Sequence, residues 1–458
     1  MKKFLLTSLI LCGFVANAQQ VFWEEKSTGF LSTSTSMPQI SYAGPDVVWT
    51  YGAPGDSSGD NYQVWSRSTD SGQTWTSGTI DLGSADLGIG DMFAVSATKA
   101  YIAVFPAAAG VFGGIYVTED AGLTWQKQTS ASFNSGSDSF ANWVYFWDAN
   151  KGVTVGDPAP AGSTGYFEIY TTLDGGLNWT RLPSSAIDAP LDGEYAYTHN
   201  YETNGDIIWF GTNKGRIFKS TDFGATWVAS QSPVNDFGSA TESASYSMKD
   251  ANNGILVTNL HGFWRTSDGA VTWVEDLGVS GYFRNFDIAA VPGCSETYVT
   301  TGEDIDGIGR GSSYSQDNGA TWIDINEIDD LDIDGGGALV FYDGTHGLAS
   351  GFTASSVSGG IWRWRSENDA CLPLSSTNFS NVSTFTASPN PTSGDLKLSG
   401  VSIASVVVYD VLGKQVAASN YDGLNVVDIN IASLNAGVYM VKVTNTQGNT
   451  STIKVVKQ

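Results

Sequence analysis

The chain has 458 residues, 53 glycines, 12% aromatic residues and a formal net charge of −25 at pH 7. This length is enough for two or three domains, and the glycine and aromatic content is typical of a protein built from strands and turns. The acidic excess argues against nucleic acid and anionic membrane surfaces as partners, because both are themselves negatively charged.

Residues 1–18 are predicted to be a signal peptide. Lys2 and Lys3 precede an apolar stretch from Phe4 to Val15, and the small-residue sequence Ala16-Asn17-Ala18 follows it. This order of basic, apolar and small residues is typical of a secretion signal that is removed after export. The apolar stretch is too short to span a bilayer and no longer one follows, so we expect no membrane span.

An eight-residue motif with Asp at its third position and Trp at its end occurs six times, and its aspartates lie 46 to 54 residues apart. A repeat of this length is typical of propellers. We expect each Asp to accept backbone N–H bonds in a tight turn, each Gly to permit a positive φ, and each Trp to be buried between units. The motif residues are Asp70, Gly72 and Trp75; Asp120, Gly122 and Trp125; Asp174, Gly176 and Trp179; Asp222, Gly224 and Trp227; Asp268 and Trp273; and Asp317, Gly319 and Trp322.

In the copy from Thr266 to Trp273 the glycine comes one place early, as Gly269 followed by Ala270. We therefore expect this turn to differ from the others. The motif resembles the Asp-box (BNR) repeat of sialidases, xyloglucanases, sortilin-type receptors and photosystem II assembly-factor-like propellers. This resemblance implies an all-β propeller in which the box aspartates hold turns and are not catalytic.

Each repeat is predicted to form four strands, with the Asp box joining the third to the fourth. A seventh unit over residues 338–365 has three predicted strands but no box, and the N-terminal segment from Val21 to Glu25 can supply its fourth. The sequence therefore predicts a seven-bladed β-propeller over residues 19–372, closed by the N-terminal strand in blade seven. Closure removes the unpaired edges of an open array. The alternative is a six-bladed ring with the seventh unit as an appendage.

Residues 373–382 are predicted to be a polar linker, and residues 383–458 a small C-terminal β-sandwich of short alternating strands. This tail contains SPNPTSG from Ser388, VYDVLGK from Val408 and LNAGVYMVKV from Leu434. It resembles the type A C-terminal sorting domain of the type IX secretion system. The resemblance implies a Bacteroidota-type host, the secretion machinery as partner, and passage through the periplasm to the outer-membrane cell surface or the medium. The alternative is an ordinary adhesion module.

Two further features concern covalent and metal bonds. Cys294 and Cys371 remain after signal removal and are expected either to form a disulfide, which an exported protein can keep, or to be two buried thiols. Asp330, Asp332 and Asp334 follow the spacing of a calcium loop, although Phe341 stands where a closing Glu is expected. The loop is therefore a candidate calcium site or simply a solvated acidic segment, and no other cofactor is expected.

No catalytic residue is predicted. Acidic residues such as Asp188, Asp192 and Glu194 are plentiful, but no pair stands out as the two carboxylates of a glycosidase. Sialidases, which share the motif, need an arginine cluster for the substrate carboxylate and an early R-I-P element. The arginines of this sequence lie in no such element, so we do not expect a sialidase. We expect a secreted or cell-surface, non-catalytic, monomeric binding propeller for a protein or glycan, with a secreted glycoside hydrolase acting on polysaccharide as the alternative. Long loops beside short ones in blades four and five predict a ligand groove on the face opposite the Asp boxes.

Overall fold

The computed structural model describes residues 21–55, 60–135, 139–160, 165–303, 310–325, 338–371, 385–411, 413–446 and 450–458. The chain divides into two compact units, residues 1–372 and 373–458. The predicted signal peptide and linker lie outside the described residues. Within them the only helix is the short 3-10 turn η1 (Ser184–Ala186), so the predicted all-β class is confirmed. No described helix is long and apolar enough to cross a membrane.

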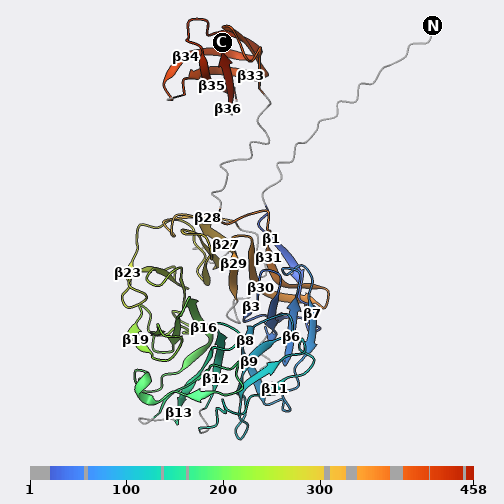
Figure 1. Ribbon diagram of the computed structural model, residues 1–458, viewed down its shortest axis with the longest axis vertical. Helices are drawn as coiled ribbons and strands as arrows, with labels where there is room; N and C mark the ends of the chain where they lie inside the picture. The colour runs from blue at the N-terminus through green and yellow to red at the C-terminus, as the bar shows by residue number, and fades with distance from the viewer. Residues whose placement is uncertain are drawn as a thin grey trace, which may run out of the picture. The chain divides into compact units, whose positions relative to one another are not determined.

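The first unit contains seven antiparallel sheets of four strands, which we number 1 to 7 from the strand that follows the N-terminal segment (Figure 1). Sheets 1 to 4 follow the chain without interruption. Their strands are β3 (Ile40–Tyr42), β4 (Val48–Tyr51), β6 (Val64–Ser68) and β7 (Thr76–Thr79); β8 (Leu87–Ala94), β9 (Ala100–Pro106), β10 (Gly114–Thr118) and β11 (Gln126–Lys127); β12 (Ala141–Phe146), β13 (Gly152–Ala159), β14 (Tyr166–Thr172) and β15 (Thr180–Arg181); and β16 (Ala196–Asn204), β17 (Ile207–Thr212), β18 (Arg216–Ser220) and β19 (Val228–Gln231).

Sheets 5 and 6 continue the pattern, and a two-residue strand, β24 (Ser280–Gly281), adds in parallel to the edge of sheet 6. Sheet 7 takes its fourth strand from the N-terminus. The remaining strands are β20 (Ala244–Met248), β21 (Gly254–Thr258), β22 (Phe263–Thr266) and β23 (Val274–Glu275); β25 (Asp287–Ala290), β26 (Tyr298–Glu303), β27 (Arg310–Ser315) and β28 (Thr321–Asp324); and β29 (Leu339–Asp343), β30 (His346–Ser355), β31 (Ser358–Trp364) and β1 (Trp23–Ser27). A separate pair joins β2 (Thr35–Ser36) to β5 (Ala53–Pro54).

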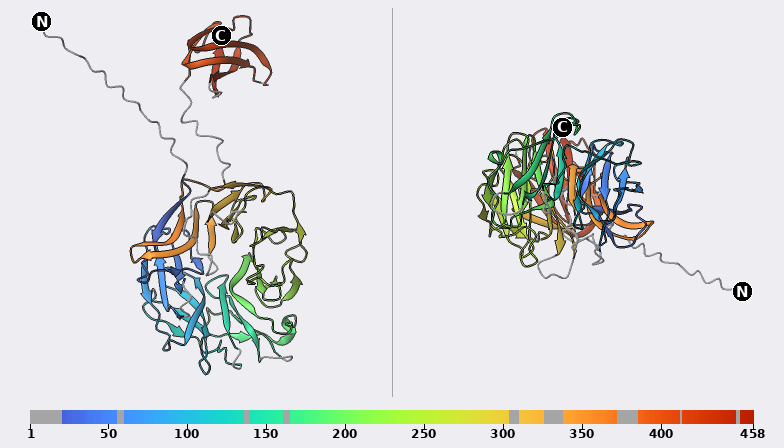
Figure 2. Two further views of the ribbon diagram at one scale, coloured as in Figure 1. Left: turned by 180° about the vertical axis from the view of Figure 1, so that it is seen from behind. Right: turned by 90° about the horizontal axis from the view of Figure 1, so that it is seen from below.

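The first strand of each sheet contacts the first strand of the next, and β29 of sheet 7 contacts β3 of sheet 1. Figures 1 and 2 show the sheets succeeding one another around a common axis, with β3, β8, β12 and β16 toward the centre and β7, β11, β19 and β23 toward the periphery. The order β1-β31-β30-β29 places Trp23 opposite Trp364 across an antiparallel ladder. The two ends of the first unit therefore meet within one sheet.

The buried apolar side chains form one cluster at each of the seven junctions between neighbouring sheets. Each box tryptophan packs at the junction with the preceding sheet, as Trp227 does between sheets 3 and 4. Sheet 7 has no box, and Trp23 of β1 fills the corresponding place at the junction of sheets 6 and 7. Its indole Nε1 donates to Ser312 Oγ over 2.7 Å. Burial of this apolar area between sheets is the main favourable term in holding them together.

The second unit is a sheet of five strands around its own apolar core. The long strand β33 pairs with β34 and with β35, and its register shifts between Ser399 and Ser405. Buried residues such as Leu398, Val408 and Val443 alternate with exposed ones along these strands. The strands are β32 (Thr386–Ser388), β33 (Asp395–Tyr409), β34 (Gln415–Asn430), β35 (Gly437–Asn445) and β36 (Thr450–Lys457).

A glycine in the second Asp box gives a direct test of how tightly these turns pack. Gly122 has φ +89°, and a Cβ on it would lie 2.4 Å from the ring of the buried Trp65. We expect Gly122→Ala to lower the free energy of unfolding by about 1–3 kcal/mol more than the control Gly83→Ala. Gly83 has a similar φ of +75° but open space around it, so the control carries only the backbone cost. Urea unfolding of both variants measures the difference, and equal losses would contradict the packing argument.

Candidate ligand site in the central channel

The six Asp boxes share one hydrogen-bond pattern, shown by the fourth. Asp222 Oδ1 accepts the backbone N–H of Thr226 and Oδ2 accepts its hydroxyl, over 2.8 and 2.7 Å. The Ser220 hydroxyl donates to Asp222 and in turn accepts the N–H of Gly224. The equivalent bonds recur at Asp70, Asp120, Asp174, Asp268 and Asp317, with Asn178 in place of Thr in the third box.

The expectation that the fifth turn differs is wrong. Asp268 accepts both bonds from Thr272, and the N–H of Ala270 donates to Thr266 Oγ1 over 3.0 Å, as in the other boxes. All six turns hold two successive residues at positive φ, and here these are Gly269 at +78° and Ala270 at +71°. The displaced glycine therefore changes only which of the two positions carries a Cβ, because the hydrogen bonds fix the backbone path.

These bonds also set the charge state of the box carboxylates. The side-chain and backbone hydrogen bonds from Thr124 lower the pKa of Asp120. At Asp222, partial burial raises the pKa, but the hydrogen bonds from Thr226 and Ser220 outweigh it, so the net pKa is lowered. Each box lies in its own sheet, so the structure gathers the aspartates around no common point. Their role is local: they hold the turn between the third and fourth strands.

The other sequence candidates fall into different places. Cys294 and Cys371 form a disulfide that links the connection inside sheet 6 to the end of sheet 7. Asp330, Asp332 and Asp334 lie outside the described residues. Within the described part of the chain, no group of three or more His, Cys, Asp or Glu side chains is arranged to hold a metal ion. His199, His261 and His346 belong to sheets 4, 5 and 7.

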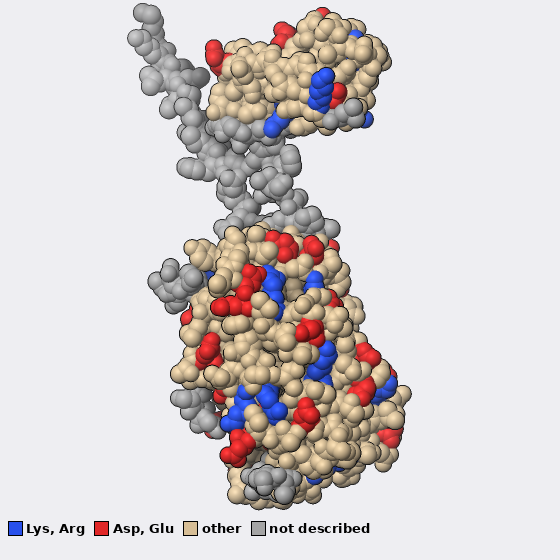
Figure 3. All heavy atoms as spheres, turned by 90° about the vertical axis from the view of Figure 1, so that its left-hand side faces the viewer, with Lys and Arg blue, Asp and Glu red and all other residues tan. Residues whose placement is uncertain are grey.

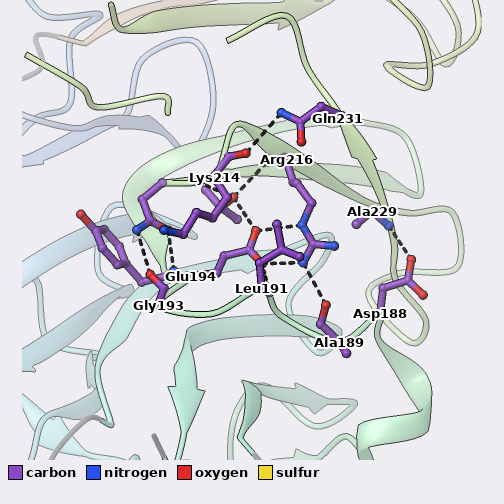
Figure 4. A network of polar contacts seen from close by, with 12 residues as sticks. Asp188, Ala189, Leu191, Gly193, Glu194, Lys214, Arg216, Ala229 and Gln231 are labelled. Atoms are coloured by element: carbon purple, nitrogen blue, oxygen red, sulfur yellow. Dashed lines mark hydrogen bonds and ion pairs between the residues drawn. The ribbon is translucent and has the colours of Figure 1, made fainter. Parts of the chain in front are cut away.

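Among the acids that precede sheet 4, Glu194 is fully buried in an ion pair with Arg216 (Figure 4). Its Oε1 also accepts the Thr212 hydroxyl over 2.7 Å, and its Oε2 accepts the backbone N–H of Leu191. Asp188 accepts the N–H of Ala229. Glu168 is paired with Arg181 in the same way in sheet 3. These carboxylates anchor loops to their own sheets.

A cavity of about 750 Å³ lies among the inner strands of the first unit. Its lining comes from β3, β16, β20, β25 and β29, and from the segment of residues 237–243 between sheets 4 and 5. Aromatic and small polar side chains predominate, and Glu202 and Asp287 are the acids among the described lining residues. No Lys or Arg belongs to that described lining. The described cavity lies at the centre of the unit, and sheets 4 and 5, where the short loops were predicted, contribute part of its lining.

Strand β16 supplies the most irregular part of this lining. Its pairing with β17 jumps from Ala196 opposite Thr212 to Tyr201 opposite Phe210, so residues 197–200 bulge out of the ladder. His199 at the bulge has φ +45°, which is uncommon for a residue other than glycine. Asn200 Oδ1 accepts the N–H of Gly211 over 3.1 Å and fixes the bulge. Bulges of this kind re-aim side chains and occur often beside functional sites.

A second feature of the centre is a succession of side-chain oxygens that each accept a backbone N–H from the next sheet. Asp91 of sheet 2 accepts from Val144 of sheet 3 over 3.0 Å, and Asp157 of sheet 3 accepts from Ala196 of sheet 4 over 3.1 Å. Asp287 of sheet 6 accepts from Leu339 of sheet 7 over 2.9 Å. The remaining links are Ser41 to Ala94, Glu202 to Met248 and Ser247 to Ala290. We call these six side chains the inter-sheet acceptors.

Burial dominates the titration of the acidic inter-sheet acceptors. It raises the pKa of Asp91 to about 8 and that of Asp157 to about 7, against the lowering effect of their hydrogen bonds. Burial, and then the charge of Asp287, raise the pKa of Glu202 to about 8. The pKa of His199 is lowered to about 4 by burial, so this imidazole is neutral at pH 7. Among the described residues, the centre thus contains acids without a cationic counterpart.

On one face of the molecule the acids do not form a continuous patch. On the face drawn in Figure 3, Lys and Arg side chains are interspersed with Asp and Glu. Sequence reasoning missed the inter-sheet acceptors, although one signal was visible. Asp91, Asp157 and Asp287 each stand inside or beside a stretch of strand-forming apolar residues, where a charged side chain needs a partner.

Comparisons with known proteins first identify the second unit. Residues 387–458 match the family described as the secretion system C-terminal sorting domain. The chain therefore carries a secretion sorting tail. This tail indicates export by the type IX secretion system to the cell surface or the medium, as its sequence predicted.

The first unit is similar to two kinds of protein. Over 299 residues the chain is 26% identical to a xyloglucanase of Paenibacillus sp, covering 57% of this chain and 27% of that protein. Over 192 residues it is 31% identical to the photosystem II assembly lipoprotein Ycf48 of Synechococcus sp. (strain CC9902), covering 38% of this chain and 54% of that protein. The chain thus spans about half or less of the length of these curated relatives.

Among solved structures, that of YCF48 bound to D1 peptide superposes with a TM-score of 0.50 at 15% identity. The match covers 76% of this chain and 98% of that one. At this identity the similarity establishes the fold, and the predicted propeller-like fold is confirmed.

The inter-sheet acceptor Asp91 gives a test based on pH. Its folded pKa of about 8 lies above the ordinary value of 3.8, so the folded state holds a proton more tightly than the unfolded state between these values. The free energy of unfolding therefore falls as pH rises from 4 to 8. We expect Asp91→Asn to remove this contribution. The free energy of unfolding of the variant should then gain, relative to that of the wild type, up to about 1.4 kcal/mol per pH unit in this window.

Urea unfolding at pH 5 and pH 8 measures this gain. The exposed Asp192, replaced by Asn, serves as the control and should follow the wild type at both pH values. If Asp91→Asn also follows the wild type, Asp91 is ionised when the protein is folded and our account of the centre is incorrect.

Proposed function

We propose that this protein is an exported, non-catalytic binding propeller, delivered to the cell surface or the medium by the type IX secretion system. The sorting tail supports the export route. The central cavity supports a binding role, because its volume lies within the range of ligand sites and its lining combines aromatic and polar side chains. The ligand is a protein or a glycan, and the propeller acts as a monomer.

The observation that carries the non-catalytic proposal is the use of the buried carboxylates. Asp91, Asp157, Glu202 and Asp287 accept backbone N–H groups from neighbouring sheets. Glu168 and Glu194 are paired with arginines in their own sheets. A glycosidase needs one carboxyl group to give a proton and a second to act on the sugar, both facing the substrate. The described buried acids instead have structural partners.

The alternative is a secreted glycoside hydrolase acting on polysaccharide, and the similarity to a xyloglucanase favours it. That similarity covers 27% of the relative, so it leaves open whether the residues that surround its substrate have counterparts here. A sialidase is disfavoured, because the eight arginines are dispersed over the sheets. Seven of them lie next to an acid, in the pairs Arg181–Glu168, Arg216–Glu194, Arg265–Asp276, Arg284–Asp324, Arg310–Glu303, Arg363–Glu24 and Arg365–Glu367.

Reducing-sugar release from a panel of polysaccharides, including xyloglucan, tests this proposal with the exported protein. We expect no turnover above the rate of a heat-denatured control. Turnover that Glu202→Gln or Asp287→Asn abolishes, in a variant whose unfolding midpoint shows that it is still folded, would establish the hydrolase instead. If our proposal is correct, these two substitutions lower the stability of the protein and leave activity unchanged, because the wild type has no hydrolase activity.

We also propose that the seven sheets are the blades of one closed ring, and that the tail sheet folds over its core as a small sandwich. The clusters shared by neighbouring sheets, including that between sheets 7 and 1, support the ring. The register shifts in β33, where a strand can bend, support the sandwich. Calcium binding by Asp330, Asp332 and Asp334 stays a prediction.

Trp23 tests whether the N-terminal strand is part of the ring. It is 2% exposed and packs against Phe341 and Trp364 of sheet 7. We expect Trp23→Ala to lower the free energy of unfolding of the first unit by about 3–5 kcal/mol, because the indole leaves a large cavity. Val21→Ala, at a residue that is 44% exposed, is the control. Urea unfolding followed by tryptophan fluorescence measures both, and a Trp23→Ala variant as stable as the control would argue for an appended N-terminus.

A further inference from the structure

We propose that the central cavity binds the guanidinium or ammonium group of an organic cation, such as an arginine or lysine side chain. This inference rests on the proposed binding function and adds the chemical class of the ligand. It follows from three independent observations: the charges of the lining, a buried hydroxyl without a partner, and the aromatic character of the walls.

The lining contains two carboxyl groups and no basic group among the described residues. The donors to these carboxyls are neutral. Asp287 accepts the Ser245 hydroxyl and the N–H of Leu339, and Glu202 accepts from Ser247 and Met248. Such donors satisfy individual oxygen lone pairs but supply no positive charge. Asp287, with a pKa of about 6, is ionised at pH 7, whereas Glu202, with a pKa of about 8, stays largely protonated and is a neutral acceptor. A carboxylate has about four acceptor sites, so both groups can also accept from a bound cation while they hold their neighbouring sheets.

Tyr246 supplies the second observation. This residue belongs to the cavity lining and is 4% exposed, yet its hydroxyl oxygen has no hydrogen-bond partner among the described residues. A buried hydroxyl is costly unless it is hydrogen-bonded, so an orphaned one in a cavity wall indicates a missing partner. Burial raises the pKa of Tyr246, and the charge of Glu202 raises it further; both residues belong to the lining of the same cavity. A cation that donates to Glu202 can therefore also donate to the Tyr246 oxygen.

The walls suit the remainder of such a ligand. Tyr197, Tyr201 and Phe286 belong to the lining, and aromatic rings attract cations through the negative charge on their faces. His199, whose pKa is lowered to about 4, adds no positive charge that would oppose binding at pH 7. A compact metal ion fits less well, because no group of three or more metal-binding side chains occurs in the described part of the chain. A planar or tetrahedral group with several N–H donors matches oxygens that come from different strands.

Isothermal titration calorimetry on the full exported protein tests the charge requirement with a matched pair of ligands. Nα-acetylarginine amide carries the guanidinium group, and Nα-acetylcitrulline amide has nearly the same shape without the charge. We expect the arginine compound to bind at least about tenfold more tightly, since one charge-assisted interaction in a buried site is enough for this ratio. Agmatine, a free amine with the same head group, shows whether peptide atoms contribute.

Two variants locate the binding in the cavity. Asp287→Asn keeps an acceptor oxygen for its neighbouring sheet but removes the charge that is present at pH 7, and should abolish the preference for arginine over citrulline. Tyr246→Phe should weaken arginine binding about threefold to tenfold through the lost hydroxyl contact. Tyr314→Phe is the matched control, because its hydroxyl is also buried and has no partner among the described residues, and Tyr314 does not belong to the described cavity lining. It should bind like the wild type.

Equal affinity for the arginine and citrulline compounds, or no binding of either, overturns the inference. So does arginine binding that Tyr246→Phe and Tyr314→Phe affect equally. If Asp287→Asn does not fold, the comparison of the two tyrosine variants decides alone. None of these results bears on the proposed non-catalytic role, which polysaccharide turnover tests separately.

Discussion

The first unit depends on one recurring interaction, in which a side-chain oxygen on the first or second strand of one sheet accepts a backbone N–H from the neighbouring sheet. Ser41, Asp91, Asp157, Glu202, Ser247 and Asp287 make this bond at six successive junctions. The apolar clusters supply attraction between the sheets, but apolar contact is not directional. The inter-sheet acceptors add direction, because each bond fixes the height and angle at which one sheet meets the next.

At the junction of sheets 7 and 1 the described residues make a different set of bonds. Thr353 of β30 accepts the N–H of Thr35 over 2.8 Å, and its own hydroxyl donates to the carbonyl of Ser32. The closing junction therefore uses the N-terminal segment rather than an acid on an inner strand. Because β1 also completes sheet 7, two separate stretches near the N-terminus hold the first unit together.

Acids at the centre have a cost and a consequence. Burial makes their ionised forms unfavourable and raises their pKa values, so part of the stability of the fold depends on pH. Two of these acids, Glu202 and Asp287, also line a cavity whose described lining has no Lys or Arg. The structural use of these carboxylates and their capacity to attract a cation are therefore two results of one arrangement. Because these buried carboxylates hold neighbouring sheets together, their abundance is weak evidence for catalysis.

The sequence by itself determined the all-β class, the Asp-box turns and the sorting tail. Each of these depends on contacts inside a short stretch, as when Asp222 bonds to Ser220 and Thr226, so the local residues specify them. One prediction from local sequence was wrong even there. The displaced glycine was expected to change the fifth turn, but the hydrogen bonds of that turn hold Ala270 at a positive φ without a glycine at this position. Only the tertiary structure decided the rest. Asp91 and Val144 are 53 residues apart, and Trp23 and Ser312 are 289 residues apart. No periodic pattern in the sequence records which of these distant residues the packing of sheets brings together.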